Sequence, residues 1–393
     1  MGDAAKLDLT AEKSGDTVAI SSFTMKSSDI DARGNAKIAP GMTGIQSVRI
    51  NKLRLGETNL DNLDYDAIPG GFKLNANGLV ADVTHWTEDD PQNPKEPTFS
   101  FQNFPALSLK ANVERVITRK QNDQRLNKVK AEVDCNQDMC KFANVSGATS
   151  DDKPFSLRIL HNPKGVRQLS INADSAGAFL RAMNIIDGMD GGVLTVTGNY
   201  DDSTRDSVLA GKVLITKHTV KDVPVLAKLL SLASLSGIID ALQGNGIQFD
   251  KLHAPYTLSK DVMTLKNAKS YGSAMGLTAE GTITFPKRTM NIEGTVVPSY
   301  TLNNVFGRVS FFGRILTGGE GQGIFAARYS IKGTNANPDV MVNPLSFLTP
   351  GFLRGLFDIF DSSGEATTDD TGDAESERKT PPVSDKPQYP NHP

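Results

Sequence analysis

Apolar and polar residues alternate with a period of two over most of this chain. Residues 277–285 (LTAEGTITF) are the clearest example, because their apolar side chains would share one face of a strand. Threonine and glutamate would share the other face. The alternation recurs before residue 175 and again at 194–197, 209–215, 290–296 and 324–331. Turn-forming sequences such as PKG at 163–165 separate the segments, so the pattern predicts antiparallel meanders in a mainly β chain.

A short motif with a central glycine recurs in these strands, as AEGT, IEGT, IKGT, VTGN, LAGK and VSGA. Glycine inside a strand marks a bulge, a bend or a close approach of two backbones. Two explanations stay open: a sheet that curves the same way at each step, or chance in a chain with 35 glycines.

A few helical sequences interrupt the strands, and short amphipathic helices are predicted near 175–190, 223–243, 302–316 and 350–360. The first is capped by Asp174 and Ser175. The second approaches the length of a membrane span, but its serines and Gly237 favour a buried or interfacial helix. The last carries an apolar stripe that would either cap the end of the sheet or lie in a membrane interface. The stripe consists of Phe352, Leu353, Leu356, Phe357 and Phe360.

Charge is distributed unevenly along the chain. The whole sequence has 42 basic and 45 acidic residues, a net charge of −3. From Asp361 onward there are eight acids and three bases, so the tail carries −5 and the rest of the chain +2. The rest of the chain therefore has no strong basic footprint, and nucleic acid is excluded as a partner. Residues 362–393 contain almost no apolar side chains and are predicted to be disordered.

The redox state of the two cysteines would indicate the cellular compartment of the protein. Cys135 and Cys140 flank the turn-forming sequence NQDM, so the thiols could meet across a hairpin. A disulfide would place the chain in an oxidising compartment, whereas two free thiols would suit the cytosol. The sequence shows neither a signal peptide nor a spanning helix, so the chain is expected to be either cytosolic or separated from its anchor.

Signatures of catalysis are missing from the sequence. The glycine-rich run at 317–323 (TGGEGQG) stands before strand-like sequence rather than before a helix, so it predicts a sharp turn and no phosphate site. The five histidines have no metal-ligand spacing, and no nucleophile elbow is present. We therefore expect no enzyme, no catalytic residue, no metal and no cofactor.

Few helices are available to cover the apolar faces of so many strands. An antiparallel sheet with one apolar face buries it against helices, another sheet or something else. Two solutions remain open: a sandwich or closed barrel, or a curved sheet whose face contacts an apolar guest such as acyl chains.

Residues 194–360 resemble the C-terminal region of AsmA-like envelope proteins, especially the long YhdP-type members of Gram-negative bacteria. The resemblance rests on ADSAGAFL at 173–180 with DGMDGG at 187–192, on LAKLLS at 226–231, on 307–323 and on NPLS at 343–346. It is only general over residues 5–170. The predicted organisation is a β-rich groove segment at 1–170, an AsmA-like groove region at 171–361 and the tail.

The resemblance implies an elongated, curved antiparallel sheet that forms an open hydrophobic groove. It further implies a non-enzymatic bridge that conducts phospholipid between inner and outer membrane, with the full-length protein anchored in the inner membrane and lying in the periplasm. Its partners would be phospholipid acyl chains, a membrane at the C-terminal stripe and envelope proteins. The alternative is a structural or assembly factor of the outer membrane with a self-packed β-sandwich. Groove-lining candidates are Leu194, Val196, Val213, Ile215, Leu277, Ile283, Phe285, Ile292, Val296, Phe325 and Tyr329.

Overall fold

The computed structural model describes residues 5–40, 43–87, 105–120, 124–204, 206–233, 236–285, 289–298, 326–334 and 338–345. These residues belong to one compact unit, Met1–Pro350. Several predicted features lie outside the described residues: the helices at 302–316 and 350–360, the turn at 317–323, Phe325, the apolar stripe and the tail.

Strands make up most of the described residues. They are β1 Lys6–Ser14, β2 Thr17–Lys26, β3 Ile30–Ile38, β4 Ile45–Leu55, β5 Thr58–Ile68, β6 Gly71–Asp82, β7 Ala106–Arg119, β8 Gln124–Cys135, β9 Cys140–Ala148, β10 Pro154–His161, β11 Arg167–Ala173, β12 Met189–Asp201, β13 Val208–Val220, β14 Ile247–Ser259, β15 Val262–Tyr271, β16 Met275–Thr284, β17 Thr289–Pro298, β18 Ala326–Thr334 and β19 Pro338–Leu345.

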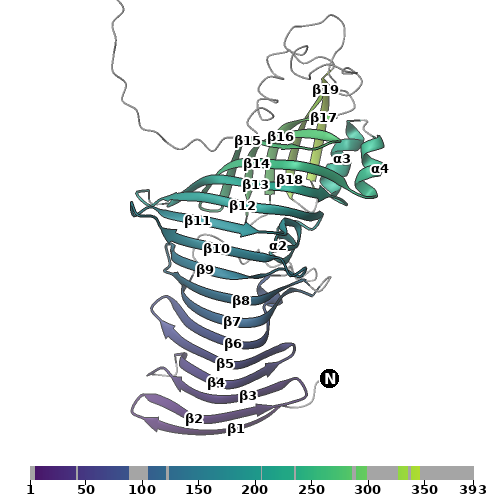
Figure 1. Ribbon diagram of the computed structural model, residues 1–393. Helices are drawn as coiled ribbons and strands as arrows, with labels where there is room; N and C mark the ends of the chain where they lie inside the picture. Colours follow the sequence, from purple (N-terminus) through teal and green to yellow (C-terminus); the bar gives the residue numbers. More distant parts are fainter. Residues whose placement is uncertain are drawn as a thin grey trace, which may run out of the picture. The chain divides into compact units, whose positions relative to one another are not determined.

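All of these strands form one sheet in which each strand pairs with its neighbours in the chain. Within the described ranges β1 pairs only with β2 and β19 only with β18, so the sheet is open, and it is visibly curved (Figure 1). The predicted mainly β, curved and open sheet is confirmed. One pair departs from the antiparallel prediction, because β6 and β7 are parallel. A parallel pair needs a crossover connection, in contrast to the tight turns that can join antiparallel strands.

The helices lie along one border of the sheet, at the same ends of the strands. They are α1 Thr84–Thr87, α2 Ala176–Ala182, α3 Pro224–Leu232 and α4 Ser236–Gln243. Since strand direction alternates, the connections after β6, β11 and β13, which contain them, emerge from the same strand ends. We call these ends the helix side. The opposite ends, the hairpin side, carry the turns between β8 and β9, β10 and β11, and β12 and β13 (Figure 1).

Two helices differ in extent from the prediction. The first ends at Ala182 and does not continue to 190, because Asn184 takes a left-handed conformation with φ 54°. The amides of Asn184 and Ile185 donate to the carbonyls of Arg181 and Leu180, which closes the helix end. The predicted helix over 223–243 is two helices, and α3 ends at Leu232 with Ala233 as its cap. No helix in the described part of the chain is long and apolar enough to cross a membrane.

The recurring strand glycines are places of close approach. A Cβ atom at Gly294 would lie 1.9 Å from the carbonyl oxygen of Thr278 and 2.6 Å from the Tyr329 hydroxyl oxygen. Aromatic residues pair with glycines across neighbouring strands in the same way elsewhere, and such pairs place a ring over the bare backbone. These pairs are Phe23–Gly34, Phe155–Gly147, Tyr256–Gly211 and Tyr329–Gly294.

Candidate functional site

One face of the sheet carries an unbroken row of apolar residues. Directly paired residues of adjacent strands project from the same face, so the register traces the row from strand to strand. It extends over β1 to β14 with one residue from each strand, and only Gly34 lacks a side chain. The apolar row is Leu9, Phe23, Gly34, Ile50, Leu63, Ala76, Ala111, Ala131, Val145, Leu157, Ile171, Val196, Val213 and Ala254.

The row continues over the last strands with a shift of two residues at an irregularity in β14. There Tyr256 pairs with Leu265, which pairs with Gly281, and Gly281 with Ile292. Ile292 pairs with Ile331, and Ile331 with Val340. All nineteen strands thus contribute to the same apolar face.

Most residues of the apolar row are only half-buried. Ala76 and Ala254 are buried, Leu9 is exposed, and the others keep part of their surface accessible. Two residues predicted from the sequence, Val196 and Val213, belong to the row. The row members before residue 175 were not singled out by the sequence analysis, although the same period-two alternation marks them.

Helix α2 covers the flank of this face on the helix side. Its Phe179 ring lies 5.3 Å from the ring of Phe155 in β10. Ala176, Phe179 and Ala182 form a buried cluster with two predicted groove residues, Leu194 and Ile215. These two residues therefore lie on the apolar face but are covered by protein in this structure.

Helices α3 and α4 cover the face over the last strands in the same way. Leu229, Leu230 and Leu242 share a buried cluster with three predicted groove residues, Ile292, Val296 and Tyr329. The Lys228 ammonium on α3 donates to the carbonyl oxygen of Pro338 in β19 at 3.1 Å, which holds the helix to the final strand.

The remaining predicted residues are more accessible. Leu277 and Ile283 are half-buried on the same face and pack against the α3–α4 cluster. Phe285 lies in the turn after β16, and its amide donates to the carbonyl oxygen of Asp261. Burial raises the pKa of Tyr329 above its usual range, and its hydroxyl donates to the carbonyl oxygen of Thr278 at 2.6 Å.

The N-terminal strands show the apolar face with the least cover. The helices have their main contacts with β7, β8, β12, β13, β14 and β19. The buried cluster nearest the N-terminus is small and consists of Leu60, Ala76 and Val113. Leu7, Leu9 and Leu55 on this face are 50%, 53% and 51% exposed. Large apolar side chains are thus accessible on β1 and β4.

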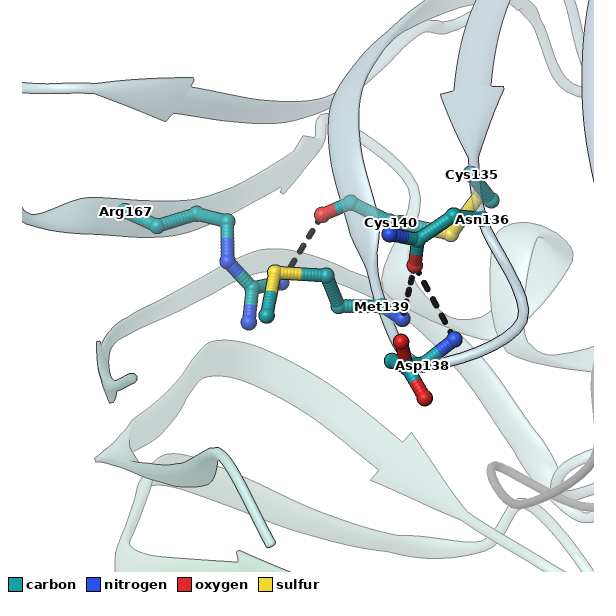
Figure 2. The surroundings of a disulfide bond; sticks show 6 residues. All are labelled: Cys135, Asn136, Asp138, Met139, Cys140 and Arg167. Carbon is teal, nitrogen blue, oxygen red and sulfur yellow. Dashed lines mark hydrogen bonds between the residues drawn. A yellow bond between two sulfur atoms is a disulfide. The ribbon is translucent and has the colours of Figure 1, made fainter. Parts of the chain in front are cut away.

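The hairpin side is reinforced by a disulfide. Cys135 and Cys140 are directly paired at the end of β8 and the start of β9, and their sulfur atoms are bonded (Figure 2). The Asn136 side-chain oxygen accepts from the amides of Asp138 and Met139 at 2.9 and 2.8 Å, which closes the turn (Figure 2). Such a bond is typical of an oxidising compartment.

Arg167 joins this hairpin to two others. Its side chain is 2% exposed and donates to the carbonyl oxygen of Cys140 at 2.8 Å (Figure 2). The guanidinium also binds both carboxylate oxygens of Asp202, at 3.1 and 2.6 Å, and lies 3.6 Å from the ring centroid of Tyr200. These hydrogen bonds from Arg167 hold the pKa of Asp202 below its usual range. These contacts compensate the buried positive charge of Arg167, so we assign this residue a structural role.

Ion pairs on the helix side also join neighbouring elements. The Asp190 carboxylate in β12 forms ion pairs with the Arg181 guanidinium of α2 and the Lys221 ammonium, at N–O distances of 2.7 and 2.5 Å. The hydrogen bond from Lys221 is the main cause that lowers the pKa of Asp190. Arg119 at the end of β7 binds Asp187 in the loop after α2. These charges are mutually compensated, so they stabilise the sheet rather than mark a reaction centre.

Across the residues that the structure describes, no three His, Cys, Asp or Glu side chains are grouped so as to hold a metal ion. His218 is 2% exposed and stacks on Phe249 with ring centroids 5.5 Å apart, so it is part of the core. The sheet therefore presents a long apolar face, with the disulfide and Arg167 contacts along one border and ion pairs along the other.

Comparisons with protein families, with curated proteins and with solved structures found no match for this chain. Its class is therefore defined by its own architecture, a single open and curved sheet with one continuous apolar face.

Proposed function

We propose that this chain is a non-enzymatic, bridge-like lipid transfer protein that conducts phospholipid along a hydrophobic groove formed by its apolar face. The observation that supports it is the apolar row, which is continuous over fourteen strands and half-buried along most of its length. Extended apolar surface that the protein does not cover marks a binding function.

The dimensions of the row suit a path rather than a pocket. At about 4.8 Å between neighbouring strands, fourteen strands carry the row over roughly 60 Å. A lipid acyl chain occupies only a short part of that length, so successive lipids would lie one after another.

The chemistry of the row suits movement. Apolar contact contributes about 25 cal/mol per Å² and has no preferred direction, so a bound acyl chain gains free energy without being fixed in place. Catalytic groups have no part in this function, which requires only an unbroken surface.

The cell envelope is the proposed location, in the periplasm between inner and outer membrane. The Cys135–Cys140 disulfide and the resemblance to AsmA-like proteins support it. In this proposal the stripe of Phe352, Leu356 and its neighbours, which lies outside the described residues, contacts the target membrane. Leu356→Asp with Phe357→Asp is expected to abolish liposome association without changing the β-content measured by circular dichroism.

Lipid carried by the purified protein provides the direct test. Native mass spectrometry and lipid extraction are expected to find phospholipid with the full chain. Leu9→Asp places a carboxylate in the row, where it costs about 2.5 kcal/mol next to hydrocarbon. Phospholipid transfer between vesicles is therefore expected to fall by roughly tenfold or more.

Thr10→Asp is the matched control, since Thr10 is also exposed in β1 but belongs to the opposite face. It is expected to leave transfer unchanged. A protein that carries no phospholipid, or equal transfer by the two variants, would contradict the proposal.

The alternative is a structural or assembly factor of the outer membrane. The described strands form one sheet and provide no second sheet for a self-packed sandwich, which favours the lipid function. Folded protein that is free of lipid but retains an envelope defect on deletion would favour the assembly role.

A further inference from the structure

Strand β1 borders the sheet in the part of the chain that the structure describes (Figure 1). It pairs with β2 on one side, and its residues from Lys6 to Lys13 are all exposed. A bordering strand has free amide and carbonyl groups that can pair with another strand. Proline, which has no amide to donate, is typical of edge strands, and β19 contains Pro338 and Pro344. β1 is nine residues long and has no proline, so it is suited to accept a further strand.

The turn after β1 shows which of its backbone groups are free. Ser14 and Thr17 flank a two-residue turn in which Gly15 has φ 61°. A hydrogen bond joins the residues that flank such a turn, so the backbone groups of Ser14 point toward β2. These directions alternate along β1 without interruption, because the extra residue in the β1–β2 register, Ser21, belongs to β2. The groups that point away from β2 belong to every second residue, namely Leu7, Leu9, Ala11 and Lys13.

A second copy of β1 can pair with this edge in the antiparallel direction. The backbone groups of two paired residues point the same way relative to the shared edge, so odd-numbered residues pair with odd-numbered ones. One such register pairs Leu9 with Leu9 and Lys6 with Glu12, and its symmetry forms the ion pair twice. Glu12 has no ion pair among the described residues, and Lys6 lies 3.3 Å from Asp8, both highly exposed. In this register β1 is complementary to itself.

The alternative registers of β1 with itself are less favourable. A shift of two residues pairs Asp8 with Asp8 in one direction and Asp8 with Glu12 in the other, and like charges directly opposite destabilise a sheet. A shift of four residues either leaves most of β1 unpaired or places Leu9 opposite Lys13 without forming an ion pair. Charge therefore favours the register centred on Leu9.

We propose that two copies of this chain associate through β1, antiparallel, with Leu9 of one copy paired with Leu9 of the other. Backbone hydrogen bonds supply the affinity, and the contact of Leu7 with Ala11 and the ion pairs of Lys6 with Glu12 set the register. Directly paired residues share a face, so the apolar row continues from one copy into the other. One strand pair buries little surface, so the dimer is reversible and forms as the protein concentration rises. The association does not depend on the lipid function.

Oxidative crosslinking tests the register. Leu9→Cys places two thiols on directly paired residues with Cα atoms about 5.5 Å apart, which a disulfide can span. The native cysteines are bonded to each other, so a covalent dimer through residue 9 is expected on non-reducing electrophoresis after oxidation of concentrated protein.

Leu7→Cys is the matched control for the crosslink. Leu7 and Leu9 are 50% and 53% exposed and lie on the same face of β1. In the proposed register Leu7 pairs with Ala11, which leaves the two copies of residue 7 roughly 13 Å apart, too far for a disulfide. Leu7→Cys is therefore expected to remain monomeric, and equal crosslinking by the two variants overturns the register.

Charge reversal tests the association in solution. Sedimentation equilibrium of the lipid-free full chain is expected to show a monomer–dimer equilibrium. Lys6→Glu places like charges opposite each other at two positions and is expected to weaken dimerisation roughly tenfold. Lys6→Glu with Glu12→Lys is expected to restore it, whereas Lys52→Glu, at an exposed lysine in β4, should dimerise as the parent does.

Circular dichroism of each variant checks that the sheet remains folded. A folded chain that stays monomeric at every concentration overturns the proposal. A dimer that neither Lys6→Glu weakens nor Leu9→Cys crosslinks overturns it as well, because such a dimer uses a different surface.

Discussion

Single glycines and aromatic residues shape the strands of this sheet. At Gly294 the absence of a side chain lets the Tyr329 ring cross β17, so that its hydroxyl donates to the carbonyl oxygen of Thr278 in β16. Tyr256 is placed in the same way, with its hydroxyl 3.5 Å from the Thr197 carbonyl oxygen and close to Gly198. A tyrosine that spans two strands in this way fixes their spacing, and burial raises the pKa of Tyr256 to about 12.

Gly294→Val is expected to destabilise the fold by about 2–3 kcal/mol, because overpacking at a close backbone contact forces the strand to shift. Urea unfolding followed by circular dichroism measures the change. Gly276→Ala is the control, since the nearest atom to a Cβ there is the Ser270 carbonyl oxygen at 3.9 Å. Equal destabilisation by the two variants would show that the close approach at Gly294 is not the cause.

His218 makes stability depend on pH. Burial lowers the pKa of His218, and its Nδ1 has no hydrogen-bond partner among the described residues. Above the unfolded value of about 6.5 the ring is neutral in both states. Below it the unfolded chain binds a proton that the folded chain does not, so the free energy of unfolding falls as pH decreases.

His218→Phe keeps the stack on Phe249 and removes the unpaired nitrogen. The variant is expected to be at least as stable as the parent at pH 7.5 and to lose less stability at pH 5.5, as measured by urea unfolding at the two values. Part of the pH dependence remains, because the pKa of His253 is also lowered. An unchanged pH dependence would contradict the assignment to His218.

At the scale of elements, the hairpins on one side are held together by Arg167. It joins the β8–β9 hairpin through Cys140 and the β12–β13 turn through Asp202, although these partners lie 27 and 35 residues away in the chain. Because Arg167 is almost completely buried, its hydrogen bonds are protected from water, and the three hairpins are expected to open together.

Arg167→Met is expected to cost about 2 kcal/mol, below the usual range for a broken buried pair because Asp202 remains partly solvated. Arg167→Lys is not expected to restore stability, since an ammonium cannot contact both oxygens of Asp202 and the Cys140 carbonyl together. Hydrogen exchange in β9, β11 and β13 measures the effect. Full stability of the Lys variant would argue against the forked geometry.

The elements also show where sequence reasoning succeeds and where it stops. Alternation identified strands well because Leu194, Val196, Leu277 and Ile283 are large and regularly spaced. It did not identify the row in the N-terminal half, where Ala76, Ala111 and Ala131 give a weak hydrophobic signal. Arg167 has the appearance of a surface residue, since nothing local to β11 reveals its partners. The parallel β6–β7 pair depends on contacts between distant segments, which periodicity does not report.

At the scale of the whole sheet, each strand pairs only with its neighbours. The stability of each strand therefore depends on the side chains and helices packed on it locally. Strands β12 to β19 have buried clusters beneath α2, α3 and α4, whereas β1 and β4 have large exposed apolar side chains. The sheet is therefore expected to be unevenly stable along its length, with the most accessible strands nearest the N-terminus.

Hydrogen exchange followed by mass spectrometry tests this gradient. Peptides from β1 to β4 are expected to exchange faster than peptides from β12 to β17 in lipid-free protein. Phospholipid is expected to slow exchange in β1 to β6 at least several-fold, because it would cover the accessible part of the row. Uniform exchange, or lipid protection confined to the helices, would contradict both the gradient and the position of the lipid.

The parallel pair β6–β7 has a consequence for how such a protein can change its length. The pair shifts the alternation by one strand, so a hairpin that begins with an odd-numbered strand lies on the hairpin side before it, as β1–β2 does, and on the helix side after it, as β7–β8 does. Removing or inserting one strand before β8 would reverse the direction of all later strands and move α2, α3 and α4 to the other border of the sheet, together with the residues they cover. Inserting or removing a whole hairpin preserves the strand directions, and each inserted hairpin would lengthen the sheet by about 10 Å. Longer and shorter versions arising in evolution are therefore expected to differ by even numbers of strands.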